Sequence, residues 1–312
     1  MPTCDQFTGC LLGLALGDAL GAPYEGGPLE RTLWKLIGRT SRGEIRWTDD
    51  TQMSLDLAES LIANDGLDLD DLAKRFADGY RWSRGYGPAA ARQLKRIRRG
   101  MPWSIANRSV YRDGSFGNGG AMRAPVIALF FAGDTARLVD AARDSARVTH
   151  AHPLGIEGAV LIAAATAAAL RSSNPIEILD AAAGHCELEP FHERLRLARA
   201  WIESPGEPSL VEVSRRLGRG IAAVDSCVTA VYVGVRFLGR TFIELQQFIA
   251  RCGGDADTIG AMAGAIWGAV NGEARLPPVP LSRLEQVDRI WNVAEALFRV
   301  SEERNCSVGP IQ

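Results

Sequence analysis

The stretch GGDADTIGAMAGAIWGAVNG, residues 253–272, carries most of what decides the fold. Its two leading glycines end one helix, and the acidic turn after them is expected to begin another at Asp257 or Thr258. This second helix carries glycines spaced four apart, at Gly260, Gly264 and Gly268. Residues four apart lie on one face of a helix, so the pattern predicts very close packing against another helix. Such spacing also occurs in membrane helix dimers, but we favour a dense core in an aqueous protein.

Helical patterns continue along the rest of the chain. Met53, Leu57 and Leu61 share one face of an expected helix that follows a first acidic motif and stops near Asn64-Asp65-Gly66. A basic helix is expected from Pro88 to Arg99, with its charges forming a solvated face. Since no alternating strand pattern or βαβ unit is evident, we predict an all-α protein, folded as a single compact helical domain.

Helix-start signals support this interpretation. Asn174-Pro175 supplies an N-cap and a first-turn proline, and Thr241 forms a capping box with Glu244. The apolar run 159–170 is shorter than the roughly 20 residues that a membrane-spanning helix needs, so a buried core helix is expected there.

Composition limits the classes of function. Hydrophobic residues at 46% and charged residues at 23% are close to the averages of globular proteins. A formal net charge of -2 provides no global attraction to nucleic acid or anionic lipid, although it leaves room for a local basic patch. The six cysteines include no C-x-x-C pair, which indicates reduced thiols. We therefore expect a cytoplasmic protein that has no membrane partner. Separately, we expect a monomer.

Two acidic motifs carry the chemistry: Trp47-Thr48-Asp49-Asp50-Thr51 and Gly253-Gly254-Asp255-Ala256-Asp257-Thr258. Carboxylate and hydroxyl oxygens, without paired cysteines or histidines, are the ligands that Mg²⁺ or Mn²⁺ prefers. For a single aspartate at a helix start, capping is the more common role. Four carboxylates brought together would repel one another unless cations compensated them. We therefore interpret the two motifs as one metal site.

Three weaker signals accompany the acids. The glycine-rich turn 114–123 enters an apolar helix and could cradle a diphosphate, although glycines also serve ordinary tight turns. It lacks the residues of a Walker loop and follows no strand. Glu25 follows Pro23 into a loop, where it reaches either a cleft or solvent. His150 and His152 lie at a helix junction, where capping, core packing and substrate contact are all open.

Together these motifs resemble those of the ADP-ribosylglycohydrolase family, which includes the dinitrogenase reductase-activating glycohydrolases. In family order they are Gly-Asp-Ala-Leu-Gly at 17–21, Thr-Asp-Asp-Thr at 48–51, Gly-Asn-Gly at 117–119, Thr149-His150, and Gly-Gly-Asp-Ala-Asp-Thr at 253–258. The resemblance spans nearly the whole chain and implies one family-type domain over residues 1–312. It also implies two divalent metal ions, Mg²⁺ or Mn²⁺, in a cleft that binds ADP-ribose. Hydrolysis would release ADP-ribose from an acceptor such as a protein side chain.

The resemblance also assigns residues to roles. The implied metal ligands are Thr48, Asp49, Asp50, Asp255, Asp257 and Thr258. The implied catalytic residues are Glu25 and Asp50. The implied substrate contacts are Asp49, Gly114, Ser115, Phe116, Gly117, Asn118, Gly119 and His150, with His152 as an alternative to the last of these.

One position departs from the nitrogenase-regulating branch, which has an aspartate where this chain has Ser115. The departure leaves the acceptor open between arginine, serine, a nucleic-acid end and a small metabolite. Nucleic acid is expected only as such an acceptor. Asp113 lies two residues upstream as a possible substitute for the missing acid.

Two rival functions share parts of this pattern. A terpene synthase would need an acid at Met53 to complete its Asp-Asp-x-x-Asp motif, so this function is disfavoured. A catalytically silent ADP-ribose-binding module could keep the glycine turn without needing every acid. Because all the matched metal positions are present, we rank this alternative below hydrolysis.

Overall fold

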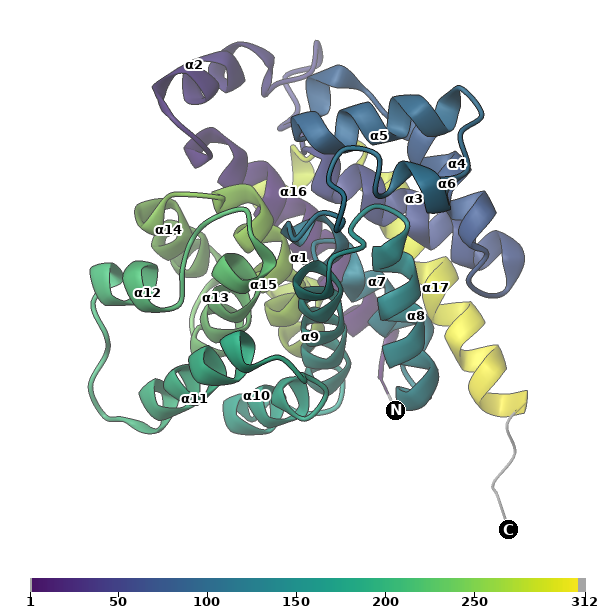
Figure 1. Ribbon diagram of the computed structural model, residues 1–312. Helices are drawn as coiled ribbons and strands as arrows, with labels where there is room; N and C mark the ends of the chain where they lie inside the picture. Colours follow the sequence, from purple (N-terminus) through teal and green to yellow (C-terminus); the bar gives the residue numbers. More distant parts are fainter. Residues whose placement is uncertain (1, 308–312) are drawn as a thin grey trace.

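The protein is seen here as a computed structural model that describes residues 2–307 (Figure 1). Its α-helices are α1 (Cys4–Gly21), α2 (Pro28–Ile37), α3 (Asp49–Asn64), α4 (Leu69–Gly79), α5 (Pro88–Arg98), α6 (Trp103–Ala106), α7 (Ala124–Phe130), α8 (Thr135–Arg147), α9 (Pro153–Ala169), α10 (Pro175–Ala183), α11 (Glu189–Glu203), α12 (Leu210–Arg216), α13 (Ala223–Arg236), α14 (Phe242–Cys252), α15 (Ala256–Asn271), α16 (Pro278–Ser282) and α17 (Val287–Ser307). Short 3-10 helices are η1 (Ala22–Tyr24), η2 (Trp82–Arg84), η3 (Asn118–Gly120) and η4 (Glu273–Arg275). Within the described residues β pairing is limited to isolated bridges, which confirms the all-α prediction.

The centre of the fold is the close packing of α1 along α15. A Cβ atom added to Gly9 would lie 2.6 Å from the carbonyl oxygen of Gly268, and one added to Gly260 would lie 2.6 Å from that of Gly17. Between these two pairs, Gly13 and Gly264 approach each other in the same way. Only glycine permits such backbone contact. The sequence predicted this packing face correctly, and its partner is the N-terminal helix.

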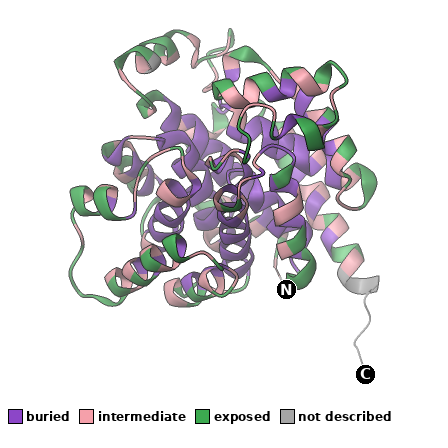
Figure 2. Cartoon of the chain, in the orientation of Figure 1, coloured by how far each residue is buried: buried purple, intermediate pink, exposed green. Residues whose placement is uncertain are grey.

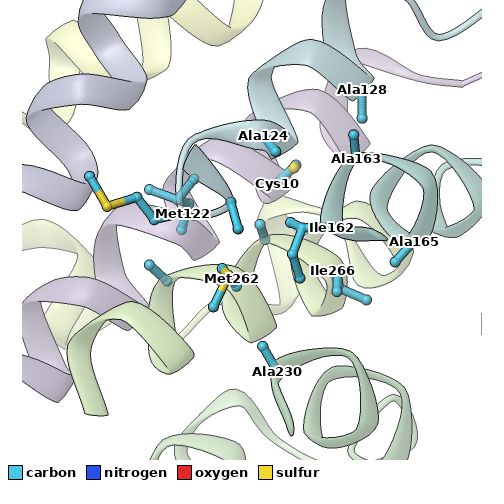
Figure 3. Close-up of a cluster of buried hydrophobic side chains, with 14 of the residues drawn as sticks. Cys10, Met122, Ala124, Ala128, Ile162, Ala163, Ala165, Ala230, Met262 and Ile266 are labelled. Atoms are coloured by element: carbon cyan, nitrogen blue, oxygen red, sulfur yellow. The ribbon is translucent and has the colours of Figure 1, made fainter. Parts of the chain in front are cut away.

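Around this pair, small apolar side chains fill the interior. Figure 3 shows Cys10 of α1, Ala163 of α9, Ala230 of α13, and Met262 and Ile266 of α15 within one buried cluster. Figure 2 shows the buried class on these central helices, while the peripheral helices have exposed outer sides. The apolar run at 159–170 lies in α9 and is buried as predicted. No helix among the described residues has both the length and the apolar character needed to cross a membrane.

Most predicted helix starts are confirmed. Thr48 caps α3 by accepting a hydrogen bond from the Asp50 amide at 3.3 Å, and Asn174 caps α10 in the same way. The capping box of Thr241 with Glu244 is present at the start of α14. The acids of the first motif thus stand at a helix start without being its cap.

The start of α15 differs slightly from the prediction. The helix begins at Ala256, one or two residues before the expected Asp257 or Thr258. The reason is a tertiary contact, because the Asp255 amide donates a hydrogen bond to the carbonyl of Arg219 at 2.9 Å. Gly254, with a φ of +79°, lets the backbone approach that carbonyl closely. This neighbour, and not the local sequence, sets where the helix begins.

Candidate active site

The two acidic motifs meet at the starts of α3 and α15. Carboxylate oxygens of Asp18, Asp50 and Asp257 lie within 4.8 Å of one another, and so do those of Glu25, Asp255 and Asp257. Asp257 belongs to both groups, which makes the arrangement one continuous acidic site. The structure therefore brings together residues that are more than 200 positions apart in the chain.

Helix capping does not account for these acids. Asp255 is the N-cap residue of α15, yet its side chain makes no capping hydrogen bond. The hydroxyls of Thr48 and Thr258 donate to one carboxylate oxygen of Asp50, at 3.2 and 3.3 Å. The other Asp50 oxygen is buried without a hydrogen-bond partner. An unpartnered buried carboxylate oxygen among further oxygen ligands fits a bound hard cation.

Asp18 is a site residue to which the sequence analysis assigned no role. Its buried carboxylate accepts hydrogen bonds from the amide of Thr48 at 3.0 Å and from the amide and hydroxyl of Thr51. It thereby holds the first acidic motif in place, and burial raises its pKa to about 6. The available signal was an acid within an otherwise apolar stretch of α1.

Three buried acids of the site have no ion-pair partner among the described residues. Within residues 2–307, no Lys, Arg or His forms an ion pair with Asp18, Asp50 or Asp257. Burial, followed by the negative charges of neighbouring acids, raises the pKa of Asp50 and of Asp257 well above the usual range. Such crowding is typical of a site that binds a cation. The donor set is entirely oxygen, which suits Mg²⁺ or Mn²⁺.

Glu25, Asp49, Asp255 and Asp257 line a cleft of about 260 Å³, whereas Asp18, Thr48 and Asp50 are not among its lining residues. Among the residues singled out from sequence, the cleft is lined by Glu25, Asp49, Ser115, Gly117, Asn118, Gly119, His150, Asp255, Asp257 and Thr258. The cleft is also lined by Met122 and Thr149, which belong to motifs found in the sequence but were given no site role there, and by Met53, Gly85, Gly87, Pro88, Ala89, Ala90, Tyr111 and Ile221, which the sequence did not connect with the site. The missed residues are mostly small or apolar, so they carried no chemical signal in the sequence.

Two residues of the expected substrate loop lie outside the cleft lining. Gly114 is buried, has a φ of +85°, and would clash with the His152 amide if it carried a Cβ atom, so it shapes the turn. Phe116 is half exposed and meets the His152 ring edge-on at 5.9 Å. The glycine-rich turn thus presents Ser115 and residues 117–119 to the cleft.

Asn118 fastens this turn to the acidic site. Its amide donates to the carbonyl of Ile221 at 3.0 Å, and its side-chain nitrogen donates to Asp255 and to the hydroxyl of Ser226. A Cβ atom at Gly119 would lie 2.5 Å from the ring of His150, so glycine is required there too. The turn and the acids are therefore held as one rigid unit.

The structure separates the two histidines. His150 lines the cleft, and its Nδ1 lies 2.8 Å from the Thr149 hydroxyl, which accepts a hydrogen bond from Arg123. Burial and the charge of Arg123 lower the pKa of His150 to about 3, so its ring is neutral at pH 7. His152 instead accepts a hydrogen bond from the Leu154 amide and caps α9. The geometry favours His150 as the residue that faces a ligand.

Ser115 lines the cleft, and its hydroxyl accepts a hydrogen bond from the Gly117 amide at 3.2 Å. Asp113 is exposed and is not among the lining residues. In this geometry Asp113 does not take the place of an acid at position 115.

The sequence profile of the family described as ADP-ribosylglycohydrolase matches residues 1–306. The chain belongs to the ADP-ribosylglycohydrolase family. It is 34% identical to the ADP-ribosylhydrolase ARH3 of Gallus gallus, over 96% of this chain and 94% of that protein. The same enzyme of Homo sapiens is 31% identical, with the same coverage. A solved ADP-ribosylglycohydrolase-related protein complex is 28% identical, with a TM-score of 0.71 over 96% of this chain and 98% of the other.

Family membership confirms the resemblance seen in the motifs. This ADP-ribosylglycohydrolase is an enzyme, a glycosyl hydrolase acting on ADP-ribose linkages. Members of the family generally depend on divalent metal ions, and the acidic cluster is compatible with such a site. Hydrolysis therefore ranks above the catalytically silent binding module.

Proposed function

We propose that this enzyme releases ADP-ribose from an ADP-ribosylated acceptor in a reaction that requires two divalent metal ions, Mg²⁺ or Mn²⁺. The observation that carries the proposal is the acidic site itself, where the unpartnered oxygen of Asp50 lies among four more buried or half-buried acids. The residues that would hold the ions are Thr48, Asp49, Asp50, Asp255, Asp257 and Thr258. Bound there, the ions would supply charge stabilisation and would orient ribose hydroxyls and water.

The glycine-rich turn is suited to hold the diphosphate. The backbone amide of the cleft-lining Ser115 makes no hydrogen bond within residues 2–307, so it is available as a donor. His150 adds a neutral ring at the same wall. Tyr111 lines the cleft and is 51% exposed, which gives the adenine a ring to stack on. The adenine and the diphosphate would thus have separate supports, and the terminal ribose, beyond the diphosphate, would be oriented at the acidic site.

Glu25 is the residue proposed to move a proton. It lines the cleft, and its carboxylate lies within 4.8 Å of those of Asp255 and Asp257. A carboxylate in this position can take a proton from attacking water or give one to the leaving group. Asp50 is the more buried acid of the first motif. As a metal ligand, it would support catalysis by fixing the positive charge of the ions beside the ribose.

Ser115 favours an uncharged acceptor. A guanidinium leaving group would be stabilised by a nearby carboxylate through charge-assisted hydrogen bonds. Ser115 carries no charge, and Asp113 lies outside the cleft lining. We therefore infer a preference for ADP-ribose linked through oxygen over ADP-ribose linked to arginine.

A substrate panel tests the proposal. Peptides ADP-ribosylated on serine or on arginine are incubated with the purified protein and Mg²⁺, Mn²⁺ or chelator, and released ADP-ribose is measured. We expect ADP-ribose to be released with either metal and not with chelator, and the serine adduct to be hydrolysed faster than the arginine adduct. Turnover should fall at least tenfold in Asp50→Asn and in Asp257→Asn. Asp113→Asn, which changes an exposed acid, serves as the matched control and should keep full turnover. Release that survives both chelator and the two acid substitutions would contradict metal dependence, whereas retention of intact ligand would indicate a silent module.

A further inference from the structure

One segment beside the cleft has a charge unlike that of the rest of the chain. Residues 81–112 contain nine Lys and Arg residues and no Asp or Glu. The whole chain has 35 basic and 37 acidic residues, so the remainder has 26 against 37, a formal charge of -11. A protein that is acidic elsewhere thus concentrates positive charge in one segment.

The fold places much of this charge on one surface. Arg92, Lys95 and Arg99 are exposed and are spaced three and four residues apart along α5 and its C-cap, so they share one face. They span about 10 Å at 1.5 Å per residue. Arg96 donates a hydrogen bond to the carbonyl of Ser109 at 2.7 Å, which ties the loop after α6 to α5.

That loop contributes two more exposed cations, Arg108 and Arg112. We call Arg92, Lys95, Arg99, Arg108 and Arg112 the α5 cationic surface. Figures 1 and 2 show α5 at the periphery of the molecule, with exposed residues along its outer side.

The density of like charge, and not the lack of ion pairs alone, distinguishes this surface. Arg75, Arg143 and Arg289 form ion pairs elsewhere, whereas the exposed Arg215, Arg216 and Arg251 form none among the described residues. Among the described residues, no carboxylate forms an ion pair with any member of the α5 cationic surface. Neighbouring like charges on a helix face are destabilising. An anion from outside the chain would offset this repulsion.

The surface continues into the active-site cleft. Pro88, Ala89 and Ala90, at the start of α5, line the cleft together with Tyr111, which directly precedes Arg112. The same segment exposes Trp82, at 76%. Cations that track a phosphate backbone, together with exposed aromatic rings on which bases stack, are typical of single-stranded nucleic-acid binding.

We propose that the α5 cationic surface docks the backbone of a single-stranded nucleic acid, so that an end of the strand lies at the cleft. Guanidinium groups bind phosphate oxygens in pairs, and the roughly 10 Å from Arg92 to Arg99 corresponds to about three nucleotide steps at the 3.4 Å rise of one DNA strand. The docking itself does not depend on catalysis. Only the consequence that an ADP-ribosylated strand end is an acceptor rests on the proposed function.

A binding measurement tests the docking. Fluorescence anisotropy of a labelled 12-nucleotide single strand is followed at 50–200 mM salt for the wild type and for Arg92→Gln/Lys95→Gln/Arg99→Gln. Each backbone contact contributes about 0.7 to the slope of log K against log salt, so the variant's slope should be shallower by about 2. Its Kd should be at least tenfold weaker at 100 mM salt.

The matched control removes the same charge from another part of the surface. Arg215→Gln/Arg216→Gln/Arg251→Gln changes three exposed arginines on α12 and α14, which lie away from α5 in Figure 1. This variant should bind within twofold of the wild type. Circular dichroism establishes that both variants are folded.

Three outcomes would overturn the docking surface: no binding by the wild type, equal loss in both variants, or tighter binding of an acidic peptide than of the oligonucleotide.

An activity measurement separates this result from the proposed function. With an oligonucleotide carrying ADP-ribose on its terminal phosphate, kcat/KM should fall at least tenfold in the α5 variant, while an ADP-ribosylated peptide is hydrolysed as before. Absence of release from both substrates would count against the proposed function and leave the binding result intact.

Discussion

At the scale of single residues, Glu25 differs from Asp18, Asp50 and Asp257 in its place in the fold. It follows the 3-10 turn of Ala22–Tyr24 and is only half buried, whereas Asp18, Asp50 and Asp257 are held within helices. A group that must accept and donate a proton benefits from such access to solvent and substrate. The buried acids are better suited to hold fixed charge.

We therefore predict that Glu25→Gln lowers kcat by about a hundredfold while KM changes less than threefold, because the amide keeps the size but loses the proton-transfer capacity. Steady-state release of ADP-ribose measures both constants. Glu302→Gln, at an exposed glutamate of α17, is the control. Recovery of wild-type turnover in excess metal would instead identify Glu25 as a metal ligand.

At the scale of elements, the glycines of α1 and α15 determine how near the two helices lie. Asp18 is carried by α1 and Asp257 by α15, so this spacing also sets the distance between two acids of the site. A Cβ atom on Gly264 would overlap the carbonyl oxygen of Gly13, which is backbone and cannot rotate away. Helix packing and site geometry are therefore coupled.

Gly264→Ala should lower the free energy of unfolding by about 1–3 kcal/mol through overpacking. Chemical denaturation measures the change, and turnover should fall as the two helices separate. Gly239→Ala is the control, because nothing lies within 4 Å of its added Cβ atom. Its stability should stay within about 0.5 kcal/mol of the wild type. Equal stability of the two variants would show that the helix contact is not tight in solution.

At the scale of the whole molecule, the acidic site joins segments from both ends of the chain. Asp18, Asp50 and Asp257 repel one another in the folded protein and are far apart when it unfolds. A cation that binds only the folded chain would offset this repulsion and stabilise the folded state.

We propose that residues 1–312 form one domain, since α1 packs against α15 and α17 and the family profile spans residues 1–306.

We predict that Mg²⁺ or Mn²⁺ at 100 times its Kd stabilises the protein by about 2.7 kcal/mol for each bound ion and raises Tm by about 4 °C for each ion, in a single transition. Thermal unfolding followed by circular dichroism measures this shift. Asp50→Asn/Asp257→Asn should be stable without metal, since it removes repulsion, and should show no shift. A metal-induced shift of equal size in this variant would place the bound ions elsewhere.

Much of the fold and of the site could be predicted from local sequence. Thr48, Asn174 and Thr241 cap helices through hydrogen bonds within three residues, and such contacts depend on neighbours that the sequence lists side by side. The glycine spacing of α15 fixed a packing face, since helix geometry alone aligns residues four apart. The acidic motifs indicated hard-metal chemistry, because ligand preference follows from atom type.

The tertiary structure decided what depends on residues distant in the chain. Asp18 entered the site because it bonds to Thr48 and Thr51, and α15 starts early because Arg219 receives the Asp255 amide. His150 rather than His152 faces the cleft for a similar reason, since Gly119 provides the space that its ring occupies. The sequence by itself determined which chemical groups are present and which helices form. Only packing decided which of those groups share a site, because a contact between distant residues depends on the path of the whole chain.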